Sequence, residues 1–180
     1  MFNRRPTLDR EIASIKDENI KNFVKRALEV APAYWWTVES SKTHHPKDER
    51  GKYGRIRHAK RCVYLSEVLA ESQSLTDLEL DELKAASILH DICVRGSQDE
   101  QSSDKALPNH PMLIRERVIS MMNDSTRRFY GQFGWYFTLY NIIETHMGKW
   151  GEKKPQTGLE KLFHIIDMIA SRDQIYIEIG

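Results

Sequence analysis

The sequence predicts an all-α fold, and two observations support this prediction. Apolar residues recur at helical spacing through most of the 180 residues, and no strand-length window alternates Val, Ile or Thr with polar residues. The length suits one structural domain with a single core. Within it, we expect residues 1–54 to form an N-terminal helix and a basic loop packed on the core, and residues 55–180 to form the core itself.

The apolar spacing divides the chain into six predicted helices. Their approximate ranges are 8–30, 56–71, 77–93, 111–122, 135–147 and 159–175. The first carries apolar side chains on one stripe and ends before Pro32. The second has His58 in line with the apolar residues of its stripe. The third opens with Thr76 or Asp77, either of which suits the N-cap position.

The last three helices have equally clear boundaries. The fourth starts near Pro111, a residue suited to the first helical position. The fifth stops at Gly148, which is expected to be a C-cap. The sixth is apolar on nearly all sides, so we expect it to be the central helix. Polar loops cover residues 40–55 and 95–108.

The composition excludes several classes of protein. Lys+Arg of 27 against Asp+Glu of 26 leaves a net charge of +1, whereas proteins that coat long nucleic acids usually have a strong basic excess. Cys62 and Cys93 lie in separate predicted helices without C-x-x-C spacing, which fits reduced apolar fillers rather than a disulfide or a zinc finger. No segment approaches membrane-spanning length. We therefore expect a soluble, cytoplasmic protein with no membrane partner; no oligomeric state is predicted.

Six residues with metal-binding side chains stand out, in five separate segments. They are His58, His90, Asp91, His110, His146 and Asp167. Most occupy stretches that are otherwise apolar, where an imidazole or a carboxylate needs a partner. A shared metal centre would give all of them one. Imidazole and carboxylate together suit Fe, Mn, Ni, Co or Zn, whereas Mg sites normally prefer oxygen ligands alone.

The order of these residues resembles the HD-domain superfamily of metal-dependent phosphohydrolases. Leu89-His90-Asp91-Ile92 is similar to the signature that defines the family, and residues 164–172, with Asp167 in an apolar helix, are similar to its last motif. The resemblance covers about 55–172. It implies an HD-domain helical bundle that holds one or two divalent ions (Fe, Mn, Ni, Co, Zn or Mg). It also implies hydrolysis of a phosphate ester of a nucleotide or a related small phosphorylated metabolite.

The resemblance extends to the dinuclear branches of the family. In these branches the second metal has ligands where this chain has His110 and His146, so we expect Asp91 to bridge two ions. The first ion would be held by His58, His90, Asp91 and Asp167. Two positions depart from the family pattern: Arg95 follows Cys93-Val94 where Gly-Lys is common after the His-Asp-Ile signature, and Met147 replaces a second consecutive histidine.

Other residues are expected to act on the substrate. The catalytic candidates are Asp91, His45, Arg95 and Lys149, and the substrate-binding candidates are Arg57, Arg61 and Trp150. His45 is expected to be an extra ligand or a proton donor to the leaving oxygen. The positive side chains would clamp phosphate groups, and Trp150 would stack on a base.

Two other functions stay open at this point. One is a 3′-to-5′ nuclease or cyclic-phosphodiester hydrolase on short single strands, because His44-His45-Pro46 resembles the entry to HD domains fused to bacterial exoribonucleases. The other is a non-catalytic HD module that binds a nucleotide. Simpler interpretations exist for single residues: helix capping for His110, a favourable helix C-terminal position for His146, a solvated loop for His44, and a hydrogen bond to a backbone carbonyl for His164.

Overall fold

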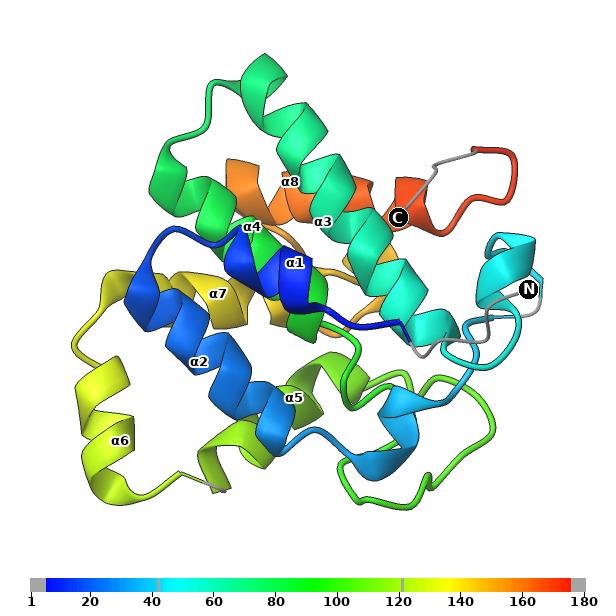
Figure 1. The fold of residues 1–180 in the computed structure, drawn as a ribbon, viewed down its shortest axis with the longest axis horizontal. Helices are drawn as coiled ribbons and strands as arrows, with labels where there is room; N and C mark the ends of the chain where they lie inside the picture. Colours follow the sequence, from blue (N-terminus) through cyan, green and yellow to red (C-terminus); the bar gives the residue numbers. More distant parts are fainter. Residues whose placement is uncertain (1–5, 42, 121, 176–180) are drawn as a thin grey trace.

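A computed structural model describes residues 6–41, 43–120 and 122–175, and within them the protein is helical with no strand (Figure 1). The α-helices are α1 Asp9–Ala13, α2 Glu18–Glu29, α3 Gly54–Gln73, α4 Asp77–Leu89, α5 His110–Ser120, α6 Asp124–Tyr130, α7 Gly134–Thr145 and α8 Gly158–Ala170. Three 3-10 helices accompany them: η1 Ala33–Trp36, η2 Lys47–Glu49 and η3 Gly148–Trp150. The all-α prediction is confirmed.

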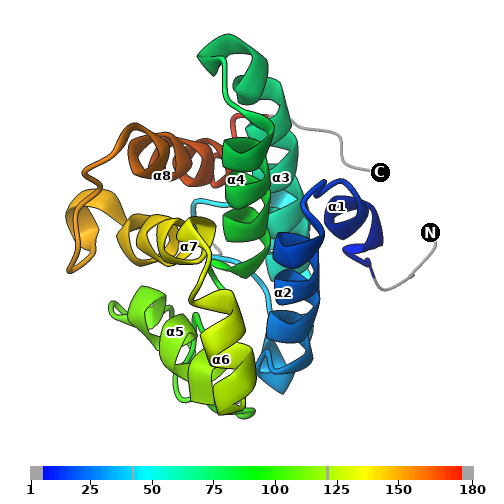
Figure 2. The same ribbon diagram turned by 90° about the vertical axis from the view of Figure 1, so that its left-hand side faces the viewer.

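Helices α3 and α4 form an antiparallel hairpin, and α4 is the central helix of the fold. In Figure 2, α4 lies between α2 and α3 on one side and α7 and α8 on the other, and it packs against all four. Residues 81–96 are buried without interruption. The expectation that the last helix is central was wrong. Helix α8 is apolar because it covers the core, and it still leaves Ile165 about half exposed.

The predicted first helix is in fact two helices, α1 and α2, with a break at residues 14–17. The side chain of Asp17 caps α2 by accepting hydrogen bonds from the backbone N–H groups of Asn19 and Ile20. The backbone N–H groups of Lys16 and Asp17 both donate to the Asp81 carboxylate of α4, at 2.9 and 2.8 Å. The break therefore depends on a residue that is distant in the sequence.

Side-chain caps set the beginning of several other helices. Thr76 and Glu79 form a capping box on α4, which confirms the predicted start of this helix. Asn123 caps α6, a short helix that the sequence did not predict. Gly148 was expected to be the C-cap of the fifth predicted helix, but the C-cap of α7 is His146, and Gly148, with a φ of +56°, begins η3 two residues later.

One apolar core contains side chains from both predicted parts of the chain, from Leu8 to Ala170. Phe23 of α2 lies fully buried at the centre of an aromatic cluster. Its ring makes edge contacts with the rings of Tyr130, Trp135, Tyr136 and Tyr140. The N-terminal helix pair is thus fastened to α6 and α7 by aromatic packing as well as to α4 by hydrogen bonds.

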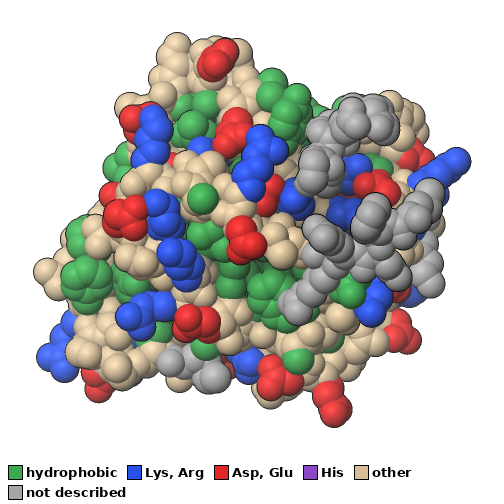
Figure 3. Space-filling model, in the orientation of Figure 1, with side chains coloured by type: hydrophobic (Ala, Val, Ile, Leu, Met, Phe, Trp, Pro, Cys, Tyr) green, Lys and Arg blue, Asp and Glu red, His purple; other side chains and the backbone are tan. Residues whose placement is uncertain are grey.

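The molecular surface matches the near-zero net charge. On the face shown in Figure 3, Lys and Arg side chains are intermixed with Asp and Glu side chains. Among the described residues, no helix combines the length and the apolar character that are needed to cross a lipid bilayer.

A buried carboxyl group on α4 leads to a prediction about stability. Burial and the negative charge of Glu79 together raise the pKa of Glu82 to about 7, against a hydrogen bond with Thr138 that lowers it. Because the folded-state pKa exceeds the unfolded one, ionisation costs the folded state stability as pH rises from about 4.5 to 7. Glu82→Gln should therefore increase the free energy of unfolding by about 1 to 2 kcal/mol at pH 8 and leave it unchanged at pH 4.5.

Urea unfolding at the two pH values measures this difference. Glu71→Gln removes a negative charge from an exposed position of α3 and is the matched control. An equal gain for Glu82→Gln at both pH values would contradict the prediction.

Candidate metal centre

All six predicted metal ligands come together in the interior of the bundle. Four of them lie at helix ends or just beyond: His90 is the C-cap of α4 and Asp91 follows it, His110 begins α5, and His146 is the C-cap of α7. The other two, His58 of α3 and Asp167 of α8, lie within helices. The ends of α4, α5 and α7 thus meet the second turn of α3 and the last turn of α8.

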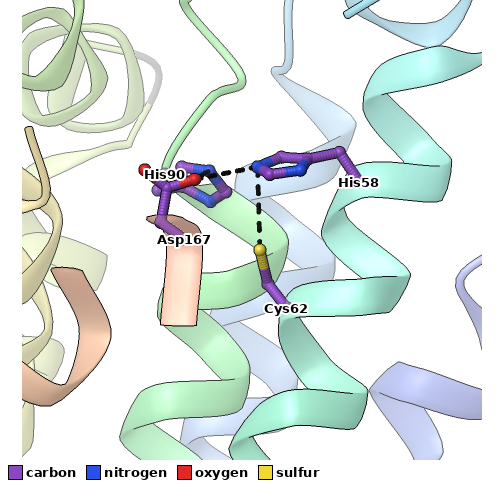
Figure 4. A group of neighbouring side chains, drawn as sticks. All are labelled: His58, Cys62, His90 and Asp167. Atoms are coloured by element: carbon purple, nitrogen blue, oxygen red, sulfur yellow. Dashed lines mark hydrogen bonds and ion pairs between the residues drawn. The ribbon is translucent and has the colours of Figure 1, made fainter. Parts of the chain in front are cut away.

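One half of the cluster is built around Asp167. Its Oδ1 atom lies 3.0 Å from His58 Nε2 and 3.7 Å from His90 Nε2. Figure 4 shows the two imidazoles and the carboxylate pointing toward one another from α3, α4 and α8. The Sγ atom of Cys62, one turn after His58 on α3, lies 3.7 Å from His58 Nε2. These four side chains could hold a metal ion.

The other half is built around Asp91. Its Oδ1 atom lies 3.0 Å from His110 Nε2 and 3.9 Å from His146 Nε2, and those two nitrogen atoms are 3.2 Å apart. The second carboxylate oxygen, Oδ2, lies 3.5 Å from His90 Nε2 and pairs with the guanidinium of Arg55. Asp91 and His90 therefore connect the two halves, as a bridging carboxylate and its neighbour would.

The four imidazoles are oriented in the same way. In His90, His110 and His146 the Nδ1 atom lies 3.1, 2.6 and 2.7 Å from the carbonyl oxygen of the residue three positions earlier. In His58 the Nδ1 atom faces the carboxylate of Glu49 at 3.5 Å. Because a carbonyl oxygen only accepts, Nδ1 carries the hydrogen in the first three rings, and each neutral ring presents a lone pair on Nε2. Metal-binding histidines show this arrangement.

The donor set fits a cation. The Nε2 atom of His90 is buried without a hydrogen-bond partner among the described residues. The Nε2 atoms of His110 and His146 face each other at 3.2 Å with a lone pair on each. Two facing lone pairs repel, and a metal ion or a proton between such atoms removes the repulsion.

Metal ligands need neutral imidazole and ionised carboxylate, and His90, His146, Asp91 and Asp167 favour these states. His58 is the exception: burial lowers its pKa, but Cys62 and the hydrogen bond with Asp167 raise it well above its usual value. Burial lowers the pKa of His90, and burial together with the neighbouring imidazoles lowers the pKa of His146 to about 3. Burial by itself raises the pKa of Asp91 and of Asp167. For Asp91, the guanidinium of Arg55 outweighs the effect of burial and holds the pKa below its usual range. For Asp167, the hydrogen bond with the imidazole of His58 does the same.

Three residues at the centre were not among the predicted site residues. Cys62, which we interpreted as an apolar filler, faces His58; its position four residues later on the same stripe was the available signal. Arg55, three residues before His58, pairs with Asp91. Glu49 lies in a charged loop that gave no signal at all, yet its carboxylate is fully buried against His45, at 2.7 Å, and His58.

The predicted phosphate-binding arginines have different environments. Arg57 donates to the backbone carbonyl oxygens of residues 48 and 52, and so holds the preceding turn. Arg61 is buried in ion pairs with Asp48 and Glu49. Arg95 lies 3.2 Å from Glu39 and donates to a Gln101 oxygen on the wall of a pocket. Of the three, Arg95 alone lines this pocket.

The remaining candidates lie on two sides of the cluster. His45 is buried and its ring centroid is 4.8 Å from that of His58, whereas His44 is exposed in the loop, as expected. Lys149 and Trp150 are exposed beyond α7, with the Lys149 ammonium over the Trp150 ring. His164 donates from Nδ1 to the His146 carbonyl at 2.7 Å, which confirms the expected backbone hydrogen bond.

Comparison of the chain with protein-family models, with curated proteins and with solved structures finds no match. The chemistry of the cluster is therefore the basis for assigning a function. Three overlapping groups of buried side chains could each hold a metal ion: His58, Cys62, His90 and Asp167; His90, Asp91 and His146; His45, Glu49 and His58.

Proposed function

We propose that the protein is a metal-dependent phosphohydrolase that cleaves a phosphate ester of a nucleotide or a related small phosphorylated metabolite. The observation that carries this proposal is the convergence of six imidazole and carboxylate side chains on two adjoining groups that meet at His90 and Asp91. The all-helical fold and the buried cluster are also compatible with the HD-domain superfamily, which the order of these residues resembles.

The ligands divide into two sets around the shared carboxylate. His58, His90, Asp91 and Asp167 would hold one divalent ion, and Asp91, His110 and His146 would hold a second. A divalent ion held by these residues would supply Lewis-acid chemistry, polarising a phosphoryl oxygen and lowering the pKa of a bound water. The mixture of imidazole nitrogens with carboxylate oxygens favours Fe, Mn, Ni, Co or Zn over Mg.

Arg55 orients the shared carboxylate. Its guanidinium donates to Oδ2 of Asp91, which leaves Oδ1 turned toward His110 and His146. A buried guanidinium beside a buried carboxylate also compensates its negative charge. Arg55 is thus a positioning residue for Asp91, and one that also lines the neighbouring pocket.

We expect His45 to exchange a proton with the leaving oxygen. The Glu49 carboxylate lies 2.7 Å from His45 Nδ1, which fixes the hydrogen on Nδ1 and leaves a lone pair on Nε2. Glu49 is itself held by Arg61 through its other oxygen. In this proposed mechanism, Arg61 therefore positions His45 through Glu49, whereas we had expected it to contact phosphate.

Elemental analysis of the purified protein, followed by an activity screen, tests the proposal. We expect one or two transition-metal ions per chain, and turnover that is lost with a chelator and restored by the same metal. The screen covers nucleoside mono-, di- and triphosphates, cyclic nucleotides and short oligonucleotides. Cleavage of cyclic nucleotides or oligonucleotides alone would favour the phosphodiesterase or nuclease alternative. Metal and nucleotide binding without turnover would favour the non-catalytic module.

Two histidine variants test whether His110 binds a metal ion or only caps helix α5. His110→Gln should reduce the metal content by about one ion per chain, whereas His44→Gln changes an exposed imidazole and should leave the metal content unchanged. An unchanged metal content in both variants would contradict the assignment of His110 as a ligand and favour a role in capping α5.

A further inference from the structure

A pocket of about 960 Å³ lies beside the metal centre, between residues 37–41 and the loop 95–106. We call it the arginine pocket, because Arg55 and Arg95 line it together with Ser40 and Lys105. Arg55 connects the pocket with the candidate metal centre, since it lines the pocket and its guanidinium pairs with Asp91 in the metal centre. A molecule in the pocket would therefore lie one side chain away from Asp91.

Three hydrogen-bond donors of the arginine pocket are buried without an acceptor. Ser40 Oγ, Arg55 Nε and Arg95 Nε have no hydrogen-bond partner among the described residues. All three residues are more than nine-tenths buried. Buried donors without an acceptor are unfavourable, and these three belong to residues that line the same pocket, which favours a ligand with acceptor oxygens there.

The lining contains three positive side chains, Arg55, Arg95 and Lys105, and two carboxylates, those of Glu39 and Asp104. Glu39 pairs with Arg95, and Asp104 accepts a hydrogen bond from Gln101, which also holds Arg95. The carboxylate and the amide fix the guanidinium of Arg95 in place, and a guanidinium that is fixed in advance binds phosphate oxygens at a lower entropic cost.

The rest of the lining favours the phosphorylated part of a substrate over its base. Four hydroxyl side chains line the pocket, those of Thr37, Ser40, Ser41 and Thr43, and no aromatic ring among the described residues does so. Nucleobases are commonly bound by stacking on aromatic side chains, whereas hydroxyl and guanidinium groups donate to phosphate oxygens.

We infer that the arginine pocket binds a second phosphoryl group of the substrate, next to the one that is hydrolysed at the metal centre. This inference rests on the proposed function and narrows its substrate class to compounds with two or more phosphoryl groups. A nucleoside diphosphate and a short oligonucleotide both offer such a group. In both compounds, the pocket would bind the oxygens of a phosphoryl group.

A binding experiment tests the pocket without catalysis. The probe is methylenediphosphonate, which carries two phosphoryl groups and is not hydrolysed, added to the full-length protein with its measured metal content. The dissociation constant is measured by calorimetry.

Arg95→Met should weaken binding of the probe at least about tenfold. Lys105→Glu, at an exposed position that should not affect folding, should weaken it several-fold. Arg127→Gln removes an exposed positive charge from α6 and should leave the affinity unchanged. Wild-type affinity in both Arg95→Met and Lys105→Glu would overturn the inference.

A kinetic experiment identifies the source of the second phosphoryl group. The wild-type kcat/KM for a nucleoside 5′-diphosphate should exceed that for the 5′-monophosphate about tenfold or more, and Arg95→Met should remove most of this preference. A preference for a dinucleotide that Arg95→Met also removes supports the same site and assigns it to a nucleic acid strand. Equal kcat/KM for mono- and diphosphate overturns the inference while the proposed hydrolase stands. Binding of the probe at the pocket without any turnover refutes the hydrolase and leaves the pocket supported.

Discussion

Asp91→Asn is expected to abolish phosphohydrolase activity, with a decrease in kcat of about a thousandfold or more, and to reduce the metal content of the protein. The physical reason is that Asp91 lies between both halves of the cluster, close to His90, His110 and His146. An amide offers one weaker donor oxygen and no charge, so neither set of imidazoles can hold a divalent ion as tightly. Steady-state kinetics and elemental analysis of the same preparation measure the two effects.

A second variant separates the loss of activity from a loss of folding. Asp91→Asn leaves the charge of Arg55 buried without its partner, which by itself destabilises the protein. The double variant Asp91→Asn with Arg55→Gln removes both charges, and it should recover stability without recovering activity. Asp173→Asn, at a partly exposed ion pair with Arg50, is the matched control and should keep wild-type activity. Wild-type turnover in Asp91→Asn would refute the role of the shared carboxylate.

Gly54→Ala is expected to lower the free energy of unfolding by about 3 kcal/mol. A Cβ atom at this first residue of α3 would overlap the carbonyl oxygen of Glu49 and come within 2.6 Å of the Ser40 backbone nitrogen. These two atoms form a hydrogen bond of 2.9 Å, and both belong to backbone that cannot rotate away. Because Glu49 supports His58 and Ser40 lines the arginine pocket, the variant should also impair binding at both sites.

Gly158→Ala provides the comparison. Gly158 is likewise the first residue of a helix, α8, and a Cβ atom there meets no atom within 4 Å. Its substitution should change the free energy of unfolding by less than about 0.5 kcal/mol or increase it slightly. Urea unfolding followed by circular dichroism measures both variants. Equal stability of the two would show that the backbone contact at Gly54 does not matter.

The sequence predicted the helices and the ligand cluster where the information is local. His58 stands on an apolar stripe of α3, and Asp167 interrupts the apolar run of α8; both positions require a partner wherever the helices pack. The structure brings both side chains to within 3.0 Å of each other. A polar side chain at an apolar position of a helix therefore correctly predicted a contact between helices that are distant in the sequence.

The features that the sequence did not predict depend on distant or irregular contacts. The break between α1 and α2 is set by Asp81, more than sixty residues away, and helix α6 is only seven residues long, too short for a periodic pattern. Glu49 is buried because η2, which contains it, packs against α3. In a run of charged residues, no sequence pattern indicates which carboxylate will be buried. Loop conformation, unlike helix periodicity, is decided by tertiary packing.

The three helix-end histidines have an implication for protein design. Each ring is held by the carbonyl oxygen of the residue three positions earlier, so part of its direction is set within four consecutive residues. Such a four-residue segment is a portable unit, and placing it at the converging helix ends of an unrelated scaffold would supply imidazoles that are partly oriented before any ion arrives.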